Sequence, residues 1–483
     1  MHSRLISPAQ MRAAEEAAFA RGISAESLMD EAGEGIARAV ARFFPRAGRC
    51  IVFAGKGHNA GDAFVAARRL AERGWEIEAR LVYPEQELSS LTTRKLSELR
   101  QVPSAGNENG LTILLDGLLG LGARPPLREP IRGACREINA LRENARVVAI
   151  DLPTGLDGDS GEADADCVIA DFTVTVGAAK RGLLADGATN FVGRLEVVPL
   201  EELRSEGESA EVATPEALRS FLPRRRFSAY KNQFGRIGIV AGSRGFTGAA
   251  VMSSLGALRG GAGLVELFVL EEIYPILAAA APPEVMVKPV ENYGDLLDEP
   301  IDVWAVGPGL GKARREEILT LIRGAKQPMV VDADGLNILA ERIETLENVR
   351  GPRLLTPHPG EMNRLFPNEK GPRAEIAAKF SEKYAVTLLL KGSRTIVAER
   401  GHPLSYNTTG DPGMATGGMG DILTGVCGAL LGQKLSPNEA ARVGAWVCGR
   451  AAELALSGGQ ASEESLLPRD VIEHLGAAFR ELR

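Results

Sequence analysis

Short apolar segments alternate along the chain with longer stretches in which apolar residues recur at helical spacing. In the first half, near-continuous apolar runs predict buried strands at 50–54, 76–82, 111–116, 147–151 and 193–198. Helical spacing predicts helices at 28–43 and 131–142. Apolar strands separated by helices imply a parallel sheet covered on both faces. The first half is therefore predicted to be an α/β domain.

A polar, acidic and aperiodic stretch at 201–211 interrupts this pattern and predicts a linker or charged surface segment. We therefore expect two domains, residues 1–210 and residues 211–483. A second block begins near residue 236, with strands predicted at 264–270, 303–306, 329–332, 353–356, 386–390 and 395–398. The second half is thus also predicted to be α/β, with a mostly parallel sheet.

Two glycine-rich loops each lead into a predicted helix. The loop 417–421 reads Gly-Gly-Met-Gly-Asp, and the loop 55–63 follows the strand at 50–54. The first N–H groups of a helix are unpaired and favour an anion, and glycine lets a phosphate approach closely. Asp421, in the first turn, could take a proton from a substrate hydroxyl or could simply cap the helix. Neither loop is a Walker A loop or a convincing dinucleotide fingerprint.

Acidic residues follow several predicted strands. Asp62, Asp116 and Asp151 could converge on one crevice at the carboxyl ends of the strands, or could each cap a helix or turn. In the second half, His358 lies between two prolines just after a strand, and Lys391 precedes a Gly-Ser turn. A glycine loop, a helix N-terminus, a lysine and an aspartate are the parts that phosphoryl transfer needs.

Composition and sequence pattern disfavour nucleic-acid binding, a membrane span and a signal peptide. A net charge of −7, a pI of about 5.6 and 5% aromatic residues offer no basic or base-stacking surface for nucleic acid. The five cysteines are scattered, which predicts reduced, buried thiols in a cytoplasmic protein. The chain contains no apolar run long enough for a membrane span and no signal-peptide pattern at its start.

The second half resembles the ADP-dependent (S)-NAD(P)H-hydrate dehydratase family of the ribokinase-like superfamily. The resemblance rests on Gly-Pro-Gly-Leu-Gly at 307–311, Leu-Thr-Pro-His-Pro-Gly-Glu at 355–361, Leu-Lys-Gly at 390–392 and the glycine loop with its helix at 414–425. Met419 replaces the usual threonine of that loop, and the segment 230–235 departs from the family's His-Lys-Gly-x-Phe-Gly pattern.

The first half resembles the NAD(P)H-hydrate epimerase family. Its signature Gly-Lys-Gly-Asn-Asn-Gly-Gly-Asp-Gly corresponds to the loop 55–63, where His58, Ala60 and Ala63 are departures. Asp-x-x-x-Gly-Thr-Gly corresponds to 116–122, with Leu121 for threonine, and Asp-Ile-Pro-Ser-Gly-Leu-Asp corresponds to 151–157. The two resemblances cover nearly the whole chain, in the order of a fused repair enzyme.

The resemblance implies a Rossmann-like three-layer domain followed by a ribokinase-like three-layer domain. In the first, Asp62 would be the acid/base of an epimerase that interconverts the R and S hydrates of NADH and NADPH. A K⁺ ion would be held by Asn59, Asp116 and Thr154, whose oxygen ligands suit a hard cation. The hydrate would contact His58, Asn59, Ala60, Gly61, Asp62, Gly120, Leu121, Gly122, Ala123, Arg124, Pro125, Pro126 and Asp151.

In the second domain, ADP would phosphorylate the ring hydroxyl of the S hydrate, and phosphate would then leave. Asp421 would deprotonate that hydroxyl, with Mg²⁺ expected on the phosphates. Ala249, Gly309 and His358 would contact the hydrate with Asp421, and the nucleotide would bind Lys391, Gly392, Ser393, Arg394, Thr395 and Gly420.

Several alternatives stay open at this point. The second half could be a small-molecule kinase that phosphorylates a stable alcohol. The first half could be a non-catalytic dinucleotide-binding module, because His58, Ala60, Ala63 and Leu121 depart from the family pattern. An ordinary nicotinamide dehydrogenase is disfavoured by the absence of a clean dinucleotide fingerprint. We expect small-molecule ligands, no nucleic-acid or membrane partner, and a homo-oligomer.

Overall fold

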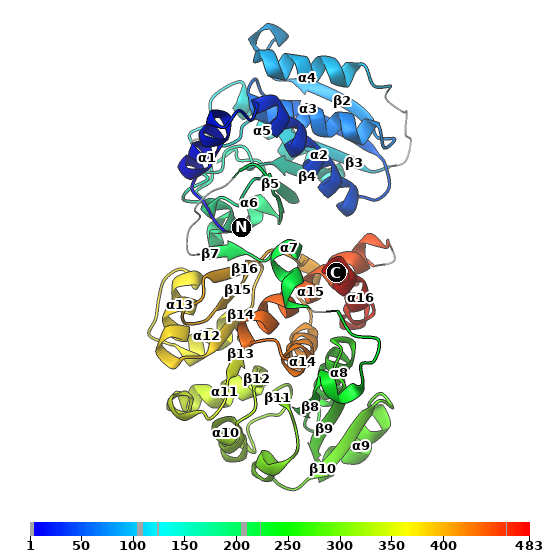
Figure 1. The fold of residues 1–483 in the computed structure, drawn as a ribbon, viewed down its shortest axis with the longest axis vertical. Helices are drawn as coiled ribbons and strands as arrows, with labels where there is room; N and C mark the ends of the chain where they lie inside the picture. The colour runs from blue at the N-terminus through cyan, green and yellow to red at the C-terminus, as the bar shows by residue number, and fades with distance from the viewer. Residues whose placement is uncertain (1–3, 104–109, 123–124, 204–209, 223, 460) are drawn as a thin grey trace. The chain divides into compact units, whose positions relative to one another are not determined.

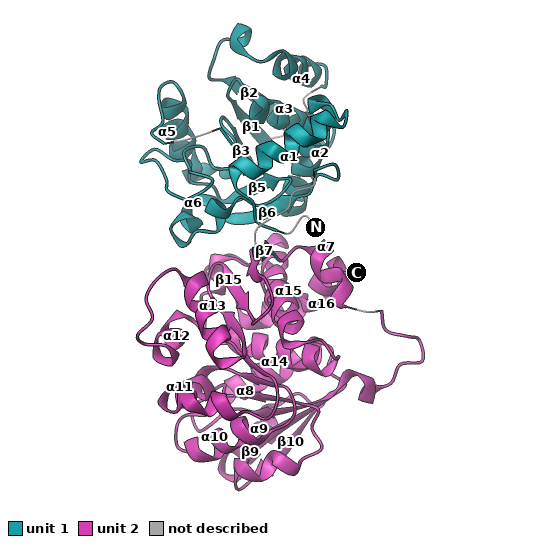
Figure 2. Cartoon of the chain, turned by 60° about the vertical axis from the view of Figure 1, so that its left-hand side comes forward, with its two compact units in different colours: residues 1–212 teal, residues 213–483 magenta. Residues whose placement is uncertain are grey.

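The computed structural model describes residues 4–103, 110–122, 125–203, 210–222, 224–459 and 461–483 (Figure 1). The chain divides into two compact units, residues 1–212 and 213–483 (Figure 2). Each unit is α/β.

The first unit is built on a six-stranded sheet of order β2-β1-β3-β4-β5-β6 in which every neighbouring pair is parallel. Its strands are β1 Arg49–Ala54, β2 Glu76–Leu81, β3 Thr112–Gly117, β4 Arg146–Ile150, β5 Phe172–Val176 and β6 Arg194–Val198. Its helices are α1 Pro8–Ala20, α2 Ala25–Phe43, α3 His58–Ala71, α4 Ser90–Arg100, α5 Ile131–Leu141 and α6 Thr189–Val192.

Alternate residues of β1 enter two different apolar cores. Cys50 and Val52 pack with residues of α1 to α4, whereas Ile51 and Phe53 pack with residues of α5. The sheet is therefore covered on both faces, and the predicted Rossmann-like three-layer arrangement is confirmed.

The second unit, together with the three residues that precede it, contains a ten-stranded sheet of order β10-β9-β8-β11-β12-β13-β14-β15-β16-β7. The pairs from β10 to β14 are parallel, and β15 is antiparallel to both β14 and β16. The strands are β7 Ala210–Val212, β8 Arg236–Val240, β9 Leu264–Leu270, β10 Val285–Val290, β11 Val303–Val306, β12 Met329–Val331, β13 Arg353–Leu355, β14 Thr387–Leu390, β15 Thr395–Ala398 and β16 Leu404–Asn407.

Helices lie on both faces of this sheet (Figure 1). They are α7 Pro215–Leu218, α8 Thr247–Arg259, α9 Tyr274–Ala280, α10 Arg315–Gly324, α11 Ala333–Glu341, α12 Pro359–Leu365, α13 Arg373–Tyr384, α14 Met419–Gly432, α15 Pro437–Ser457 and α16 Pro468–Glu481. Ile237 and Ile239 of β8 pack with α8, α14, α15 and α16, whereas Phe268 and Trp304 pack together on the opposite face with ring centroids 5.4 Å apart.

Helices α8 and α14 pack directly against each other through small residues. A Cβ at Gly256 would lie 2.4 Å from the Ile422 carbonyl oxygen, and one at Gly260, just after α8, would lie 3.1 Å from Cα of Val426. Nearer the helix starts, a Cβ at Gly418 would lie 3.9 Å from Met252. Contacts that advance together along both helices mean that the two run parallel. Their N-termini, each carrying unpaired N–H groups, therefore open at the same end.

Two strands, β7 and β10, were not predicted from the sequence. The stretch 201–211 is not wholly irregular, because its last residues belong to β7; residues 204–209 lie outside the described part. Strand β10 carried no clear signal because it is an edge strand that contains Pro289 and is largely half-buried or exposed, where a buried-strand pattern is not required.

Two candidate active sites

A buried aspartate joins three elements of the second unit. Asp332 follows β12 and is 1% exposed. Its Oδ1 lies 2.7 Å from Nζ of Lys391, which follows β14, and its Oδ2 accepts a 2.8 Å hydrogen bond from Oγ1 of Thr424 on α14. One carboxylate therefore fixes a lysine and the first turns of α14 at the carboxyl end of the sheet, where ligands of open α/β sheets bind.

Asp421 lies beside this group. Gly418 is the N-cap of α14, and Asp421 is the third helical residue, so the alternative that Asp421 serves as the N-cap is wrong. Burial and the nearby Asp332 carboxylate raise the pKa of Asp421 to about 6, although Lys391 opposes the shift. A Cβ at Gly420 would lie 3.4 Å from Nζ of Lys391. The predicted catalytic aspartate, Gly420 and the predicted lysine thus lie together.

Neighbouring carboxylates keep the Lys391 side chain charged. Burial opposes an ammonium ion, but the Asp332 and Glu361 carboxylates outweigh burial, so the pKa of Lys391 is raised. The ammonium therefore stays charged near neutral pH and can attract the phosphates of a nucleotide.

His358 reaches this group through Glu361. The His358 side chain caps α12: its Nδ1 accepts hydrogen bonds from the N–H groups of Gly360, at 3.0 Å, and Glu361, at 3.3 Å. The Glu361 carboxylate accepts the His358 N–H at 2.8 Å and lies 3.9 Å from Nζ of Lys391. With Nδ1 accepting, the neutral ring carries its proton on Nε2, and the side chain is half exposed.

Ala249 and Gly309 form a second part of the site. A Cβ at Gly309 would lie 3.0 Å from the Cβ of Ala249, in the first turn of α8. Ser243 Oγ donates to the Gly309 carbonyl at 2.8 Å, and the Gly242 N–H donates to the Pro308 carbonyl at 2.8 Å. These bonds hold the loops after β8 and β11 together at the end where α8 and α14 both begin.

The remaining predicted nucleotide residues differ in what they can offer. Gly392 and Ser393 are exposed, and Thr395 donates to the Gly392 carbonyl at 3.1 Å. The Arg394 side chain is buried, and its carbonyl accepts a 2.6 Å hydrogen bond from Arg373. A nucleotide contact at Arg394 would therefore use its backbone.

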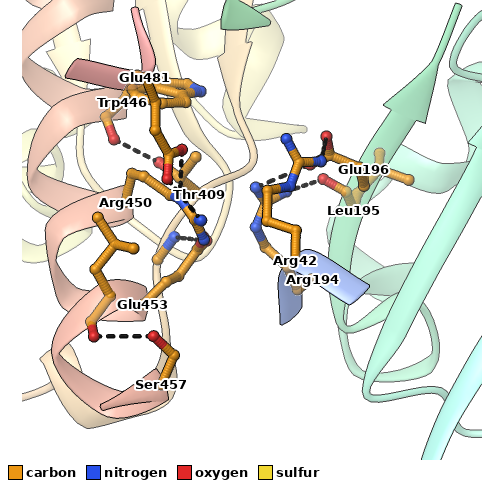
Figure 3. Close-up of polar contacts among 12 residues, drawn as sticks. Arg42, Arg194, Leu195, Glu196, Thr409, Trp446, Arg450, Glu453, Ser457 and Glu481 are labelled. Atoms are coloured by element: carbon orange, nitrogen blue, oxygen red, sulfur yellow. Dashed lines mark hydrogen bonds and ion pairs between the residues drawn. The ribbon is translucent and has the colours of Figure 1, made fainter. Parts of the chain in front are cut away.

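A buried arginine anchors the loop that leads to Gly418 (Figure 3). Arg450 on α15 donates two hydrogen bonds to the Glu481 carboxylate of α16, at 2.8 and 2.9 Å, and a third to Glu453 at 2.9 Å. Glu453 in turn accepts the Gly410 N–H at 2.9 Å, and Thr409 donates to the Trp446 carbonyl at 3.0 Å. The start of the glycine-rich loop is thus fixed to the core.

In the first unit, a fully buried carboxylate marks the end of β3. Asp116 accepts hydrogen bonds from the backbone N–H and Oγ1 of Thr154, at 2.8 and 2.7 Å, and from the Leu118 N–H at 3.2 Å. Burial raises the pKa of Asp116 to about 6 despite these donors. Asn59 adjoins the same loop, since a Cβ at Gly120 would lie 3.0 Å from its Oδ1. The three predicted K⁺ ligands are therefore neighbours.

Asp62 and Asp151 lie close to a buried lysine. Asp151 follows β4 with φ of 67°, an uncommon value outside glycine. Its carboxylate pairs with Lys180, which is fully buried and also donates to Oγ1 of Thr175 at 3.1 Å and to the Val176 carbonyl at 2.8 Å. Asp62 lies inside α3, so it is not a cap, and burial together with Asp151 and Glu15 raises its pKa well above the usual range.

The other predicted hydrate contacts fall on the loop before α3 and the loop 120–126. Ala60 is fully buried, and a Cβ at Gly61 would lie 2.4 Å from Met29, so neither presents a side chain to a ligand. His58 is exposed, and the Leu121 carbonyl accepts a 2.6 Å hydrogen bond from Arg12. Gly122, Pro125 and Pro126 follow in the loop, whereas Ala123 and Arg124 lie outside the described residues.

The structure adds residues that sequence reasoning missed as site residues, namely Asp332, Glu361, Thr424, Lys180 and Glu15. Asp332 ended a predicted strand, and Glu361 stood in the motif at 355–361. Lys180 and Glu15 carried no local signal, because only the packing of the sheet and of α1 brings them to Asp62 and Asp151.

Two negative findings hold for the described ranges. They contain no group of three or more His, Cys, Asp and Glu side chains arranged to hold a metal ion. None of their helices combines the length and apolar character that crossing a membrane requires. All five cysteines are free and buried, as predicted.

Comparison with known proteins covers both halves. Residues 237–475 match the family model described as NAD(P)H-hydrate dehydratase, and residues 25–182 match that of the YjeF-related protein N-terminus. The bifunctional NAD(P)H-hydrate repair enzyme of Gloeobacter violaceus is 37% identical over 92% of this chain and 91% of its own length. The Escherichia coli enzyme of the same name is 34% identical over 92% of this chain and 88% of its own length.

The chain belongs to this bifunctional repair enzyme family. A ribokinase-like superfamily protein from Enterococcus faecalis superposes with a TM-score of 0.50 at 24% identity, over 58% of this chain and 98% of its own, which confirms the ribokinase-like fold. An ADP/ATP-dependent NAD(P)H-hydrate dehydratase from Bacillus subtilis, co-crystallised with ATP and Mg²⁺, is 28% identical over 56% of this chain and 98% of its own, with a TM-score of 0.48.

Proposed function

We propose that this member of the repair enzyme family restores hydrated NADH and NADPH in two steps. The first unit interconverts the R and S hydrates, and the second dehydrates the S hydrate with ADP, giving AMP and phosphate. One observation carries the proposal: Asp421, with a pKa of about 6, lies beside Lys391 and Asp332 at a glycine-rich helix start, in a chain with bifunctional relatives over nearly its full length.

The chemistry of the second site follows from the leaving group. Hydroxide leaves a carbon poorly, whereas a phosphate leaves readily. Asp421, ionised above about pH 6, takes the proton of the ring hydroxyl, and the oxygen attacks the terminal phosphorus of ADP. Lys391 and the N–H groups of α14 stabilise charge on the transferred phosphoryl group. Phosphate then departs as the neighbouring ring carbon loses a proton, which restores the double bond.

Mg²⁺ fits this site as a phosphate-bound ion. Asp332 and Glu361 supply two carboxylates within 4 Å of the Lys391 ammonium, and magnesium is commonly held by one or two carboxylates plus phosphate oxygens. Asp332 and Glu361 would hold it, and the ion would neutralise phosphate charge. Ala249, Gly309 and His358 would contact the hydrate, and Gly420 with the residues from Lys391 to Thr395 would bind the nucleotide.

In the first unit, Asp62 would serve as the acid/base. Its raised pKa favours the protonated carboxyl, so Asp62 can protonate the departing ring oxygen and take a proton back when the oxygen returns to the other face. Asp151, fixed by Lys180, would contact the dinucleotide together with the loop 120–126 and with His58 to Gly61.

K⁺ fits the Asp116 site in this unit. The carboxylate is fully buried, and no described cationic side chain pairs with it, while Asn59 and Thr154 add neutral oxygens. Nδ2 of Asn59 is itself buried without a partner among the described residues. Asn59, Asp116 and Thr154 would hold the ion, which would supply the missing positive charge beneath the substrate loop.

Measuring the reaction products tests the proposed function directly. With S hydrate, ADP and Mg²⁺, we expect one AMP and one phosphate for each NADH formed. A stable phosphorylated product without NADH would instead indicate a ribokinase-like kinase. Running ATP in parallel determines which nucleotide the chain uses. We further propose that residues 1–210 and 211–483 carry these two activities in a cytoplasmic homo-oligomer.

A further inference from the structure

One aromatic side chain at the second site is exposed. Phe246, the residue before α8, is 64% exposed, although most large apolar side chains of the described chain are buried. An exposed ring at the edge of a binding site offers a flat apolar face that a ligand ring can contact.

The backbone and Cβ of Phe246 lie beside Gly309 and Ala249, two of the predicted hydrate contacts. A Cβ at Gly309 would lie 3.0 Å from the Cβ of Phe246 and 2.9 Å from its carbonyl oxygen. The Phe246 N–H donates to the Ser243 carbonyl at 2.9 Å, and Ser243 Oγ donates to the Gly309 carbonyl at 2.8 Å. Because the backbone and Cβ are packed and hydrogen-bonded, the exposed surface of Phe246 belongs to its ring.

The ring is therefore exposed to solvent, and its Cβ lies next to Gly309 and Ala249, at the end of the unit where α8 and α14 both begin. Asp421 lies at that same end, in the first turn of α14. A dinucleotide that reaches Asp421 with its reacting ring while touching Ala249 and Gly309 passes beside Phe246. Hydration leaves part of the nicotinamide ring conjugated with its carboxamide, and this flat surface can lie against an aromatic face.

We propose that Phe246 is a substrate-binding residue of the dehydratase site and that its ring stacks on the nicotinamide ring of the hydrate. The assignment rests on the function proposed above. Gly309 then has a clear role, because the absence of a side chain there lets the start of α8 and its aromatic ring approach the loop after β11.

The test compares Phe246→Ala, Phe246→Tyr and the control Phe227→Ala in steady-state dehydration of NADH hydrate. Phe227 is a fully exposed phenylalanine of the same unit. Loss of one stacking contact should raise the KM for hydrate in Phe246→Ala by roughly 5- to 100-fold, with the KM for ADP unchanged. Phe246→Tyr, which keeps an aromatic face, and Phe227→Ala should behave like the wild type.

Product inhibition tests which part of the dinucleotide stacks on Phe246. NADH, and ADP-ribose, which lacks the nicotinamide, are each measured as competitors of the hydrate. Weaker inhibition by NADH alone in Phe246→Ala supports the nicotinamide assignment, whereas equal weakening of both overturns it. An active wild type with an unchanged hydrate KM in Phe246→Ala would overturn this inference alone; an inactive wild type would overturn the proposed function as well.

Discussion

Nζ of Lys391 and Oδ1 of Asp332 lie 2.7 Å apart, although 59 residues separate them in the chain. The Asp332 side chain is 2% exposed and that of Lys391 is 20% exposed, so solvent screens this pair less than a surface ion pair. The pair positions the cation that would meet the nucleotide, and the remaining oxygen of Asp332 binds α14 through Thr424.

Replacing Asp332 should impair both stability and dehydration. Asp332→Ala leaves the Lys391 ammonium without its nearest acid, and losing one partner of a buried pair costs about 3–5 kcal/mol. We expect a large fall in kcat for dehydration, measured with S hydrate and ADP, and a lower denaturation midpoint.

Two variants serve as controls for Asp332→Ala. Thr424→Val removes only the hydroxyl and should cost about 1–2 kcal/mol. Lys312→Met removes an exposed partner of Glu341 and should change stability by less than about 1 kcal/mol. Similar stability losses in Asp332→Ala and Lys312→Met would contradict the role given to the buried pair.

Dehydration should depend on the ionisation of Asp421. Its pKa of about 6 predicts that kcat rises with pH through about 6 and then levels. Asp421→Asn should lower kcat by about 10²- to 10⁴-fold, the range typical of a lost general base, and should remove the pH dependence centred there. A rate that is flat from pH 5 to 8 in the wild type would contradict this assignment.

The same carboxyl should make the protein less stable at high pH. A folded-state pKa above the unfolded value means that ionisation is harder in the folded protein, so stability falls as pH rises from about 4 to about 6. Asp421→Asn should therefore raise the melting temperature at pH 8, by an amount equivalent to about 3 kcal/mol, and have little effect at pH 4. A lower melting temperature at pH 8 would show that the carboxylate is stabilising.

K⁺ should stabilise the first unit in a pH-dependent way. At ten times its dissociation constant, an ion that binds only the folded state adds about 1.4 kcal/mol. Since the pKa of Asp116 is about 6, protons compete with K⁺ below that pH, and the thermal shift should be larger at pH 8 than at pH 5. Asp116→Asn should abolish the shift. An equal shift in the variant would place the ion elsewhere.

The buried lysine of the first unit should be essential to its fold and its chemistry. Lys180→Met leaves the Asp151 carboxylate buried without a cation, which costs about 3–5 kcal/mol. Epimerisation should be lost while dehydration of pure S hydrate persists. Arg100→Met, which breaks an exposed pair with Glu85, is the matched control and should cost less than about 1 kcal/mol. Retained epimerisation in Lys180→Met would exclude a role for this pair.

Sequence pattern predicted most elements because they are locally encoded. The strands at 264–270, 303–306 and 395–398 have the predicted bounds, since each is a short apolar run ended by polar or glycine residues. The edge strand β10 and the short strand β7 were not predicted, because neither needs a fully apolar sequence.

Side-chain partnerships could not be predicted in the same way. Motifs placed Asp421, Lys391 and Asp62 at loops and helix starts, but a lysine after β14 meets an aspartate after β12 only through the strand order. Lys180 meets Asp151 only because β5 lies beside β4. Strand order is a property of the whole fold, so no local window contains it.

The central claim, that one chain repairs both hydrates, is tested most directly by following NADH absorbance from a mixture of R and S NADH hydrate with ADP and Mg²⁺. The wild type should recover all of the NADH. Asp62→Asn should stop once the S form is consumed, apart from slow spontaneous epimerisation, and Asp421→Asn should recover almost none. No NADH from the wild type, with ADP or with ATP, would contradict the account.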